Sequence, residues 1–166
     1  MNIDELKVVL LHNPLNEIDA ALKGFDVGSF DKYGNNILHY YVKSSESINI
    51  PAESIIQLFI DYGIDINTRQ SRMPKRTALQ LAVMNKSKHV FDMLINKGAD
   101  VNTLDGDGNV ALSDALFWYR GDDGDGYFIE TLIAKGARND IENNYGVTPR
   151  GLADTVANYD LKKFFV

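Results

Sequence analysis

Apolar residues recur along the chain with a helical spacing, and each run ends at a glycine. Large apolar residues stand eight, seven, four and three positions before Gly63, Gly98 and Gly136. That spacing places them on one face of a helix. Glycine readily takes the left-handed conformation that ends a helix, so these glycines and Gly24 are predicted helix stops. The three apolar sets are Ile55, Ile56, Phe59 and Ile60; Val90, Phe91, Leu94 and Ile95; and Phe128, Ile129, Leu132 and Ile133.

A shorter apolar stretch follows each glycine phrase and has its own turn signal in front. Examples are "YGNNILHYYV" at 33–42 and "DGNVALSDAL" at 107–116. Glycine and asparagine favour a turn, and the apolar run after them favours a helix. The pattern therefore predicts a repeated unit of turn, helix, loop and helix.

The repeated phrases resemble the ankyrin repeat family. "GNNILHYYV" at 34–42, "TALQLAV" at 77–83 and "YGVTPRGLA" at 145–153 are similar to its T-P-L-H-x-A signature, and "GADVN" at 98–102 is similar to its closing phrase. The resemblance covers nearly the whole chain. It implies an all-α ankyrin-repeat solenoid of paired antiparallel helices with projecting turns.

The resemblance divides a single domain, 1–166, into five units. Their approximate bounds are 1–28, 29–67, 68–102, 103–139 and 140–166. The first and last are expected to be atypical caps, because an end unit has one face in water. The first unit agrees, since its stripe positions hold Asn16, Glu17, Ala20 and Ala21.

Several positions depart from the family pattern. The spacing between glycines predicts insertions between the two helices of a unit at 43–53 and 119–127, and a smaller one in the turn 68–77. The signature proline is replaced by Ile37, Ala78 and Ala111, and the signature histidine by Gln80, Ser113 and Gly151. At the retained His39, the resemblance implies a structural hydrogen bond to the turn backbone.

Composition narrows the class of protein. The chain has 166 residues, no cysteine and a net charge of −6. We expect a cytoplasmic protein without disulfides, because the start of the chain resembles no secretory signal and no run is long enough for a membrane span. The acidic charge argues against nucleic acid and anionic membranes as partners and favours a basic protein surface.

The sequence offers no complete catalytic or metal site, so we expect no enzyme activity, no cofactor and no metal. The three histidines fall in different units without ligand spacing. The phrase "DGDGN" at 105–109 spaces carboxylates as a calcium loop does. However, Val110 stands where that loop needs glycine, and Leu116 where it needs a bidentate glutamate.

Three features are candidates for binding another protein. The first is "LFWY" at 116–119, in which Phe117, Trp118 and Tyr119 either anchor a partner or form a satellite core under the neighbouring insertion. The second is an acidic region whose candidate contacts are Asp105, Asp107, Asp122, Asp123 and Asp125. The third is a pair of projecting turns that carry Tyr33 and the basic residues Arg69, Arg72, Lys75 and Arg76.

The function that follows is protein binding by a repeat module. One hypothesis is an immunity or inhibitor protein for a basic toxin. The alternatives are an adaptor or secreted effector that docks on a host protein, and a structural subunit of a larger assembly. A monomer is favoured.

Overall fold

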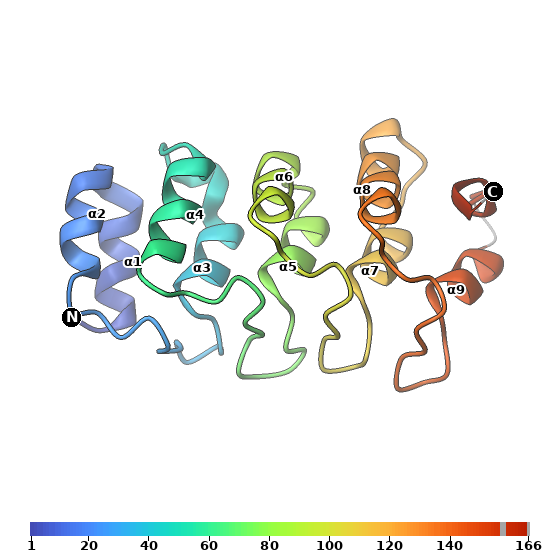
Figure 1. Ribbon diagram of the computed structural model, residues 1–166, viewed down its shortest axis with the longest axis horizontal. Coiled ribbons are helices and arrows are strands. Elements are labelled where there is room, and N and C mark those ends of the chain that lie inside the picture. Colours follow the sequence, from blue (N-terminus) through green and yellow to red (C-terminus); the bar gives the residue numbers. More distant parts are fainter. Residues whose placement is uncertain (157–158, 166) are drawn as a thin grey trace.

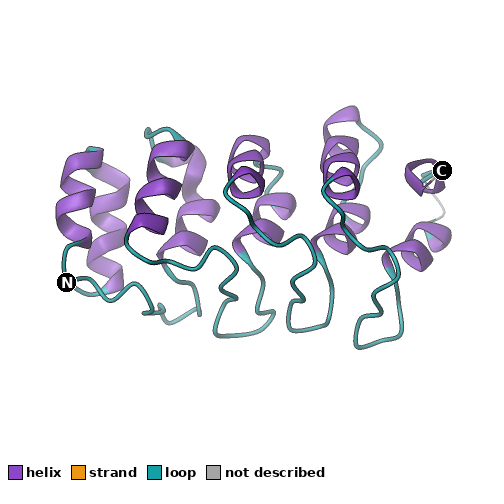
Figure 2. Cartoon of the chain, in the orientation of Figure 1, coloured by secondary structure: helices purple, strands orange, loops and turns teal. Residues whose placement is uncertain are grey.

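The computed structural model describes residues 1–156 and 159–165, and this part of the chain is helical, without β-strands. The predicted all-α architecture is confirmed (Figures 1 and 2). The α-helices are α1 (Ile3–His12), α2 (Leu15–Leu22), α3 (Ile37–Ser44), α4 (Ala52–Asp61), α5 (Ala78–Met84), α6 (Lys88–Asn96), α7 (Ala111–Phe117), α8 (Asp123–Ala134) and α9 (Pro149–Thr155). Two 3₁₀ helices are η1 (Ser45–Ser47) and η2 (Lys162–Phe165).

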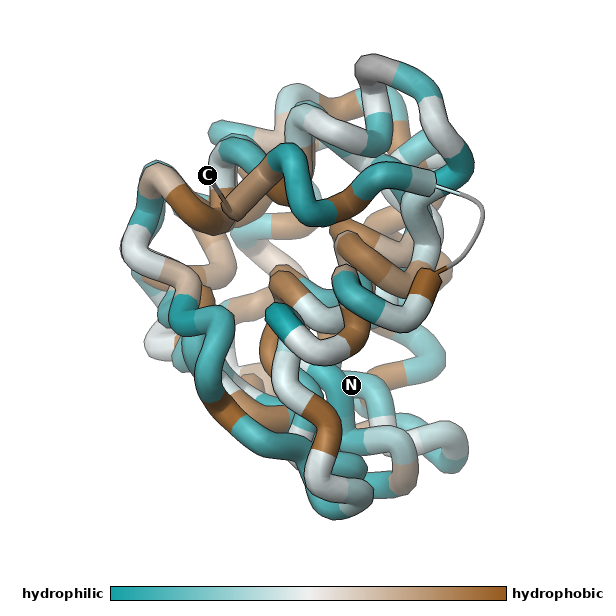
Figure 3. Tube along the Cα trace, turned by 90° about the vertical axis from the view of Figure 1, so that its right-hand side faces the viewer, coloured by the Kyte–Doolittle hydropathy of each residue, from teal (hydrophilic) through white to brown (hydrophobic). Residues whose placement is uncertain are grey.

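The helices form two stacked rows. One row consists of α1, α3, α5, α7 and α9, each of which packs against the next, and α2, α4 and α6 pack likewise in the other. Helix α8 continues the second row, because the rings of Phe91 and Phe128 meet edge to face at 5.0 Å. The turns between units all project to one side (Figure 1). Seen along the stack, these turns at the bottom of the molecule are mostly hydrophilic (Figure 3).

The predicted apolar stripes form the core. The first three residues of each stripe are buried, and the fourth, Ile60, Ile95 or Ile133, is partly buried at its edge. In the first unit, α2 buries Ile18 and Leu22 instead. Its stripe positions Asn16 and Glu17 lie in solvent, so this outer face of α2 is polar as expected.

The recurring phrase "GADVN" ends one helix and fastens the unit to the next. Gly98 has φ of 87°, the left-handed conformation predicted for a helix stop. The Asp100 carboxylate then accepts a hydrogen bond from the Asn102 N–H at 2.9 Å, which closes the turn. The Asn102 side chain in turn accepts from the N–H of Arg138, one unit further on, at 2.8 Å. Asn67 makes the equivalent bond to the N–H of Asp100, so the same contact joins the second unit to the third and the third unit to the fourth.

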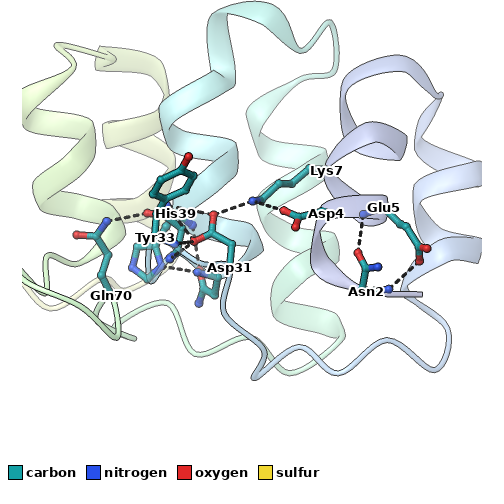
Figure 4. A network of polar contacts seen from close by, with 10 residues as sticks. Asn2, Asp4, Glu5, Lys7, Asp31, Tyr33, His39 and Gln70 are labelled. Carbon is teal, nitrogen blue, oxygen red and sulfur yellow. Dashed lines mark hydrogen bonds and ion pairs between the residues drawn. The ribbon is translucent and has the colours of Figure 1, made fainter.

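A second recurring device shapes the projecting turns. Asp31, Asp105 and Asn143 each accept hydrogen bonds from the backbone N–H groups two and four residues further on, at 2.8–3.0 Å. Such a side chain holds its own turn closed. The acidic phrase at 105–109 is therefore a turn-forming sequence. Asp31 also pairs with Lys7 of α1 at 2.7 Å, which ties the first two units together (Figure 4).

His39 makes the structural bond that the family resemblance implies. His39 is buried between the turns of two units (Figure 4). Its Nδ1 accepts from the Asn36 N–H at 3.2 Å, and its Nε2 donates to the Thr68 carbonyl of the next unit at 3.0 Å. Burial lowers the pKa of His39 from 6.5 to about 4, so the ring is neutral near pH 7. Gln80 makes the same bridge in the third unit, where its Nε2 donates to the Asn109 carbonyl at 3.0 Å.

The two larger insertions differ in structure. The first forms η1 and the loop that leads to Pro51, between two helices as predicted. The second lies only partly between helices, because α8 already begins at Asp123 and has 12 residues against 9 in α6. The Asp122 side chain accepts from the Asp125 N–H at 2.6 Å and caps the helix. This N-cap turns an apparent acidic loop into the first turn of α8.

Truncating a side chain of the central core should lower the stability of the whole stack. Leu79 is 1% exposed, so we expect Leu79→Ala to reduce the free energy of unfolding by about 2–5 kcal/mol through lost packing and a cavity. Denaturant unfolding measures this change. Val8→Ala, at an exposed site on α1, is the control and should cost much less. A loss at Leu79 no larger than at Val8 would contradict the packing described here.

The buried histidine should make the protein sensitive to acid. The folded-state pKa of His39 is about 4 and its ordinary value is 6.5, so the unfolded chain binds the extra proton between these values and stability falls as pH falls from 6.5 to 4. Because Gln80 makes the same bridge without titrating, we expect His39→Gln to remove about 2–3 kcal/mol of this loss. Urea unfolding across this pH range measures it. His89→Gln, on the surface, should leave the loss unchanged.

Candidate protein-binding site

A pocket of about 350 Å³ lies where the first helices of the last two units meet their projecting turns. We name it the α7–α9 pocket, because its walls come mainly from α7, α9 and the turns that precede them, with Arg76 from the turn before α5. It is lined by Arg76, Asn109, Ser113, Asp114, Phe117, Trp118, Asn143, Tyr145, Val147, Thr148 and Leu152. It thus combines an aromatic rim with polar and charged side chains.

Aromatic side chains expose large surfaces at the rim. Phe117 is 59% exposed and Trp118 is 37% exposed, and their rings meet edge to face at 5.3 Å. Tyr145, on the projecting turn opposite, is 74% exposed. Sequence reasoning missed Tyr145, although it occupies the same turn position as the selected Tyr33, two residues after the side chain that closes the turn.

The pocket lies at the junction where a bridging side chain is missing. His39 and Gln80 each reach the next unit from the third position of a first helix. In α7 this position holds Ser113, which is too short for that bridge. We attribute the open space of the pocket to this replacement, because Ser113 lines it.

Asp114 is the acidic group in the wall of the pocket. It is 6% exposed, and its Oδ1 lies 3.8 Å from Arg76 Nη2. The pKa of Asp114 is raised to about 7, mainly by burial; the positive charge of Arg76 and a hydrogen bond from Gln80 oppose this rise, and the charge of Asp105 adds to it. The equivalent positions in α3 and α5 hold Tyr40 and Leu81. The fold therefore does not require an acid at this position.

Comparison with known proteins agrees with the helical stack. Residues 7–105 and 48–143 match the family model described as ankyrin repeats in three copies. The chain belongs to the ankyrin repeat family. This confirms the resemblance found in the sequence, and ankyrin repeats are protein-binding modules.

The relatives found among curated proteins are viral ankyrin repeat proteins. Ankyrin repeat protein FPV031 of fowlpox virus (strain NVSL) is 27% identical over 172 residues, which cover 99% of this chain and 48% of the relative. Ankyrin repeat protein OPG189 of variola virus is 25% identical over 129 residues, which cover 76% of this chain and 22% of the relative. The chain thus spans about half or less of the length of these relatives.

The ankyrin structure separates the three aromatic residues of "LFWY". Phe117 and Trp118 lie at the pocket rim, where they can contact a partner. Tyr119 is 6% exposed and packs edge to face against Tyr159 at 5.3 Å and Phe164 at 5.7 Å. Of the two alternatives for this stretch, the partner anchor is therefore wrong for Tyr119. It belongs to a satellite core completed by the C-terminal segment.

The acidic candidates separate in the same way. Asp105 and Asp125 are buried, so the prediction that they form an exposed binding surface is wrong. Asp105 closes its turn, and Asp125 pairs with Lys86 at 2.6 Å and accepts from the Arg120 N–H at 2.7 Å. Asp122 is exposed and caps α8, and Asp107 is partly exposed on its turn. The side chain of Asp123 lies outside the described part of the structure.

The basic candidates also do not form one surface. Arg72 and Lys75 are exposed on the projecting turn of the third unit, and Tyr33 is exposed on the turn before it. Arg69 donates to the Leu104 carbonyl at 3.2 Å and so links two turns. Arg76 points away from this group, because its guanidinium faces Asp114 in the α7–α9 pocket.

Two other kinds of feature are absent from the part of the chain that the structure describes. Among the residues that the structure describes, no group of three or more histidine, aspartate and glutamate side chains is placed to hold a metal ion. Over the same residues, no helix is both long enough and apolar enough to cross a membrane.

Neutralising Asp114 should change how stability depends on pH. Its folded-state pKa is about 7 and its ordinary value is 3.8, so the folded chain holds the extra proton between these values, and stability falls as pH rises through this range. We expect the stability of Asp114→Asn, measured relative to that of the parent, to increase by about 2–3 kcal/mol as the pH rises from about 5 to about 8. Chemical unfolding at both pH values measures this. Asp107→Asn is the control, and an equal pH response in both variants would contradict the burial of Asp114.

Proposed function

We propose that this ankyrin repeat chain binds a partner protein at the α7–α9 pocket, with Phe117 and Trp118 as anchors. The observation that carries the proposal is the exposure of both rings beside a pocket of about 350 Å³. Tryptophan is enriched among residues that dominate protein interfaces, because it buries a large rigid surface at small entropic cost. Tyr145 provides a third aromatic surface from the opposite turn.

A basic region of the partner fits the charge near this site. Asp107 and Asp122 remain outside the core, and the whole chain carries a net charge of −6. Such charges mainly increase the rate of encounter with an oppositely charged surface, whereas aromatic anchors that become buried on binding slow dissociation. The buried Asp105 and Asp125 keep a structural role in this proposal.

The biological setting is a separate hypothesis. An immunity or inhibitor role predicts a basic toxin as the partner, encoded by a neighbouring gene. An adaptor or effector role predicts a host protein, and a structural role predicts stable co-purification with a larger assembly. In each setting we propose a cytoplasmic location and no catalytic activity, because the supporting features are a binding pocket and a repeat scaffold.

The anchor can be tested once a pull-down from native lysate and mass spectrometry have identified a partner. We expect Trp118→Ala to weaken binding by about 2 kcal/mol or more, mainly through faster dissociation in surface plasmon resonance. Phe30→Ala is the matched control, because Phe30 has the same exposed fraction, 37%, on a different unit. If a folded Trp118→Ala binds like the parent, or Phe30→Ala loses as much, this site is not the interface.

A further inference from the structure

The charges around the α7–α9 pocket are unbalanced. Asp105 and Asp114 are two buried carboxylates, and the guanidinium of Arg76 faces Asp114. Within the described residues, Oδ2 of each aspartate is buried and has no hydrogen-bond partner. A buried carboxylate oxygen without a partner is unfavourable, so a second cation at this point would be stabilised. The raised pKa of Asp114 reflects the same imbalance.

The rim suits a cation with a flat head and an apolar stem. Phe117, Trp118 and Tyr145 offer aromatic surfaces, and Val147 and Leu152 add aliphatic ones. A guanidinium stacks on aromatic rings and donates up to five hydrogen bonds, whereas an ammonium is a compact and strongly hydrated charge. Asn109 and Asn143 also line the pocket, where Asn143 Nδ2 donates to Asn109 Oδ1 at 2.8 Å and joins the two turns. These features favour arginine over lysine.

Two departures from the repeat pattern create this combination at one junction. Ser113 replaces the bridging side chain and opens the space, and Asp114 places a carboxylate where the equivalent residues are Tyr40 and Leu81. Neither change is needed to pack α7, because the third unit packs with Gln80 and Leu81 at these positions. Ser113 and Asp114 are therefore better explained by binding than by the packing of α7.

We infer that the α7–α9 pocket binds an arginine side chain of the partner protein, with the guanidinium on Asp114 Oδ2 and the stem against Phe117 and Trp118. The inference rests on the proposed function and adds the chemistry of the group that enters the pocket.

A short peptide tests this pocket without the partner. The probe is the tripeptide Gly-Arg-Gly, blocked at both ends, and its control contains citrulline, which has the same shape and no charge. Trp118 is the only tryptophan of the chain, so its fluorescence reports binding at the rim. We expect saturable binding of the arginine peptide and binding of the citrulline peptide that is weaker by roughly tenfold or more.

Two variants separate binding from folding. Asp114→Asn removes the charge and should weaken binding of the arginine peptide by roughly tenfold or more. Ser113→Gln should fill the pocket and restore the bridge that Gln80 makes, so it should abolish binding while keeping or raising the melting temperature. Asp61→Asn, at an exposed site on α4 that does not line the pocket, is the control for charge and should bind like the parent.

The dependence of binding on pH gives a readout that a purely structural role would not change. The groups facing Asp114 are Arg76, Asp105 and Gln80. Binding of a guanidinium needs the ionised carboxylate, so the affinity of the parent should rise roughly tenfold between about pH 5.5 and pH 8. In Asp114→Asn this rise should disappear.

The outcomes are distinct from those of the proposed function. Equal binding of the two peptides, or arginine-peptide binding that persists in both variants, would overturn the arginine pocket. If Trp118→Ala weakens binding of the captured partner while Asp114→Asn and Ser113→Gln leave that binding unchanged, the proposed interface stands and the arginine inference is wrong.

Discussion

No helix pair of this chain can bury its apolar stripe alone, so every unit depends on contact with the next. Phe59, Phe91 and Leu132 are fully buried only because a neighbouring pair covers them. Stability in such a stack is approximately the sum of units and of the interfaces between them. The junctions are therefore where sequence matters most for folding, and the faces away from them can vary for binding.

Two kinds of polar bond secure the junctions without using the exposed faces. The asparagine that closes the second and third phrases, Asn67 or Asn102, accepts from a backbone N–H of the next unit. The third residue of the first helix, His39 or Gln80, donates to a carbonyl of the next turn. Because these bonds involve backbone groups of the neighbour, side chains such as Phe117 can change without disturbing the register of the stack.

The sequence predicts the stack better than it predicts the site. Helix stops such as Gly98 and the buried stripes follow from local conformational preference and periodicity, which are visible in one chain. The burial of Tyr119 and Asp125 does not follow from the neighbouring sequence. Tyr119 packs against Tyr159 and Asp125 pairs with Lys86, and both partners lie far away in the sequence. The pocket was missed because it arises where the side chain of Ser113 is short. Empty space next to a short side chain has no sequence motif that would reveal it.

The missing bridge at Ser113 has a thermodynamic consequence for the last two units. In the third unit Gln80 couples neighbours permanently, whereas across the α7–α9 pocket this coupling can come from whatever occupies it. A molecule that contacts both α7 and α9 binds only when the two units are docked, so its binding free energy adds to the stability of that junction. The partner would thus couple the last two units reversibly, and the cooperativity of unfolding at this end of the stack would depend on partner concentration.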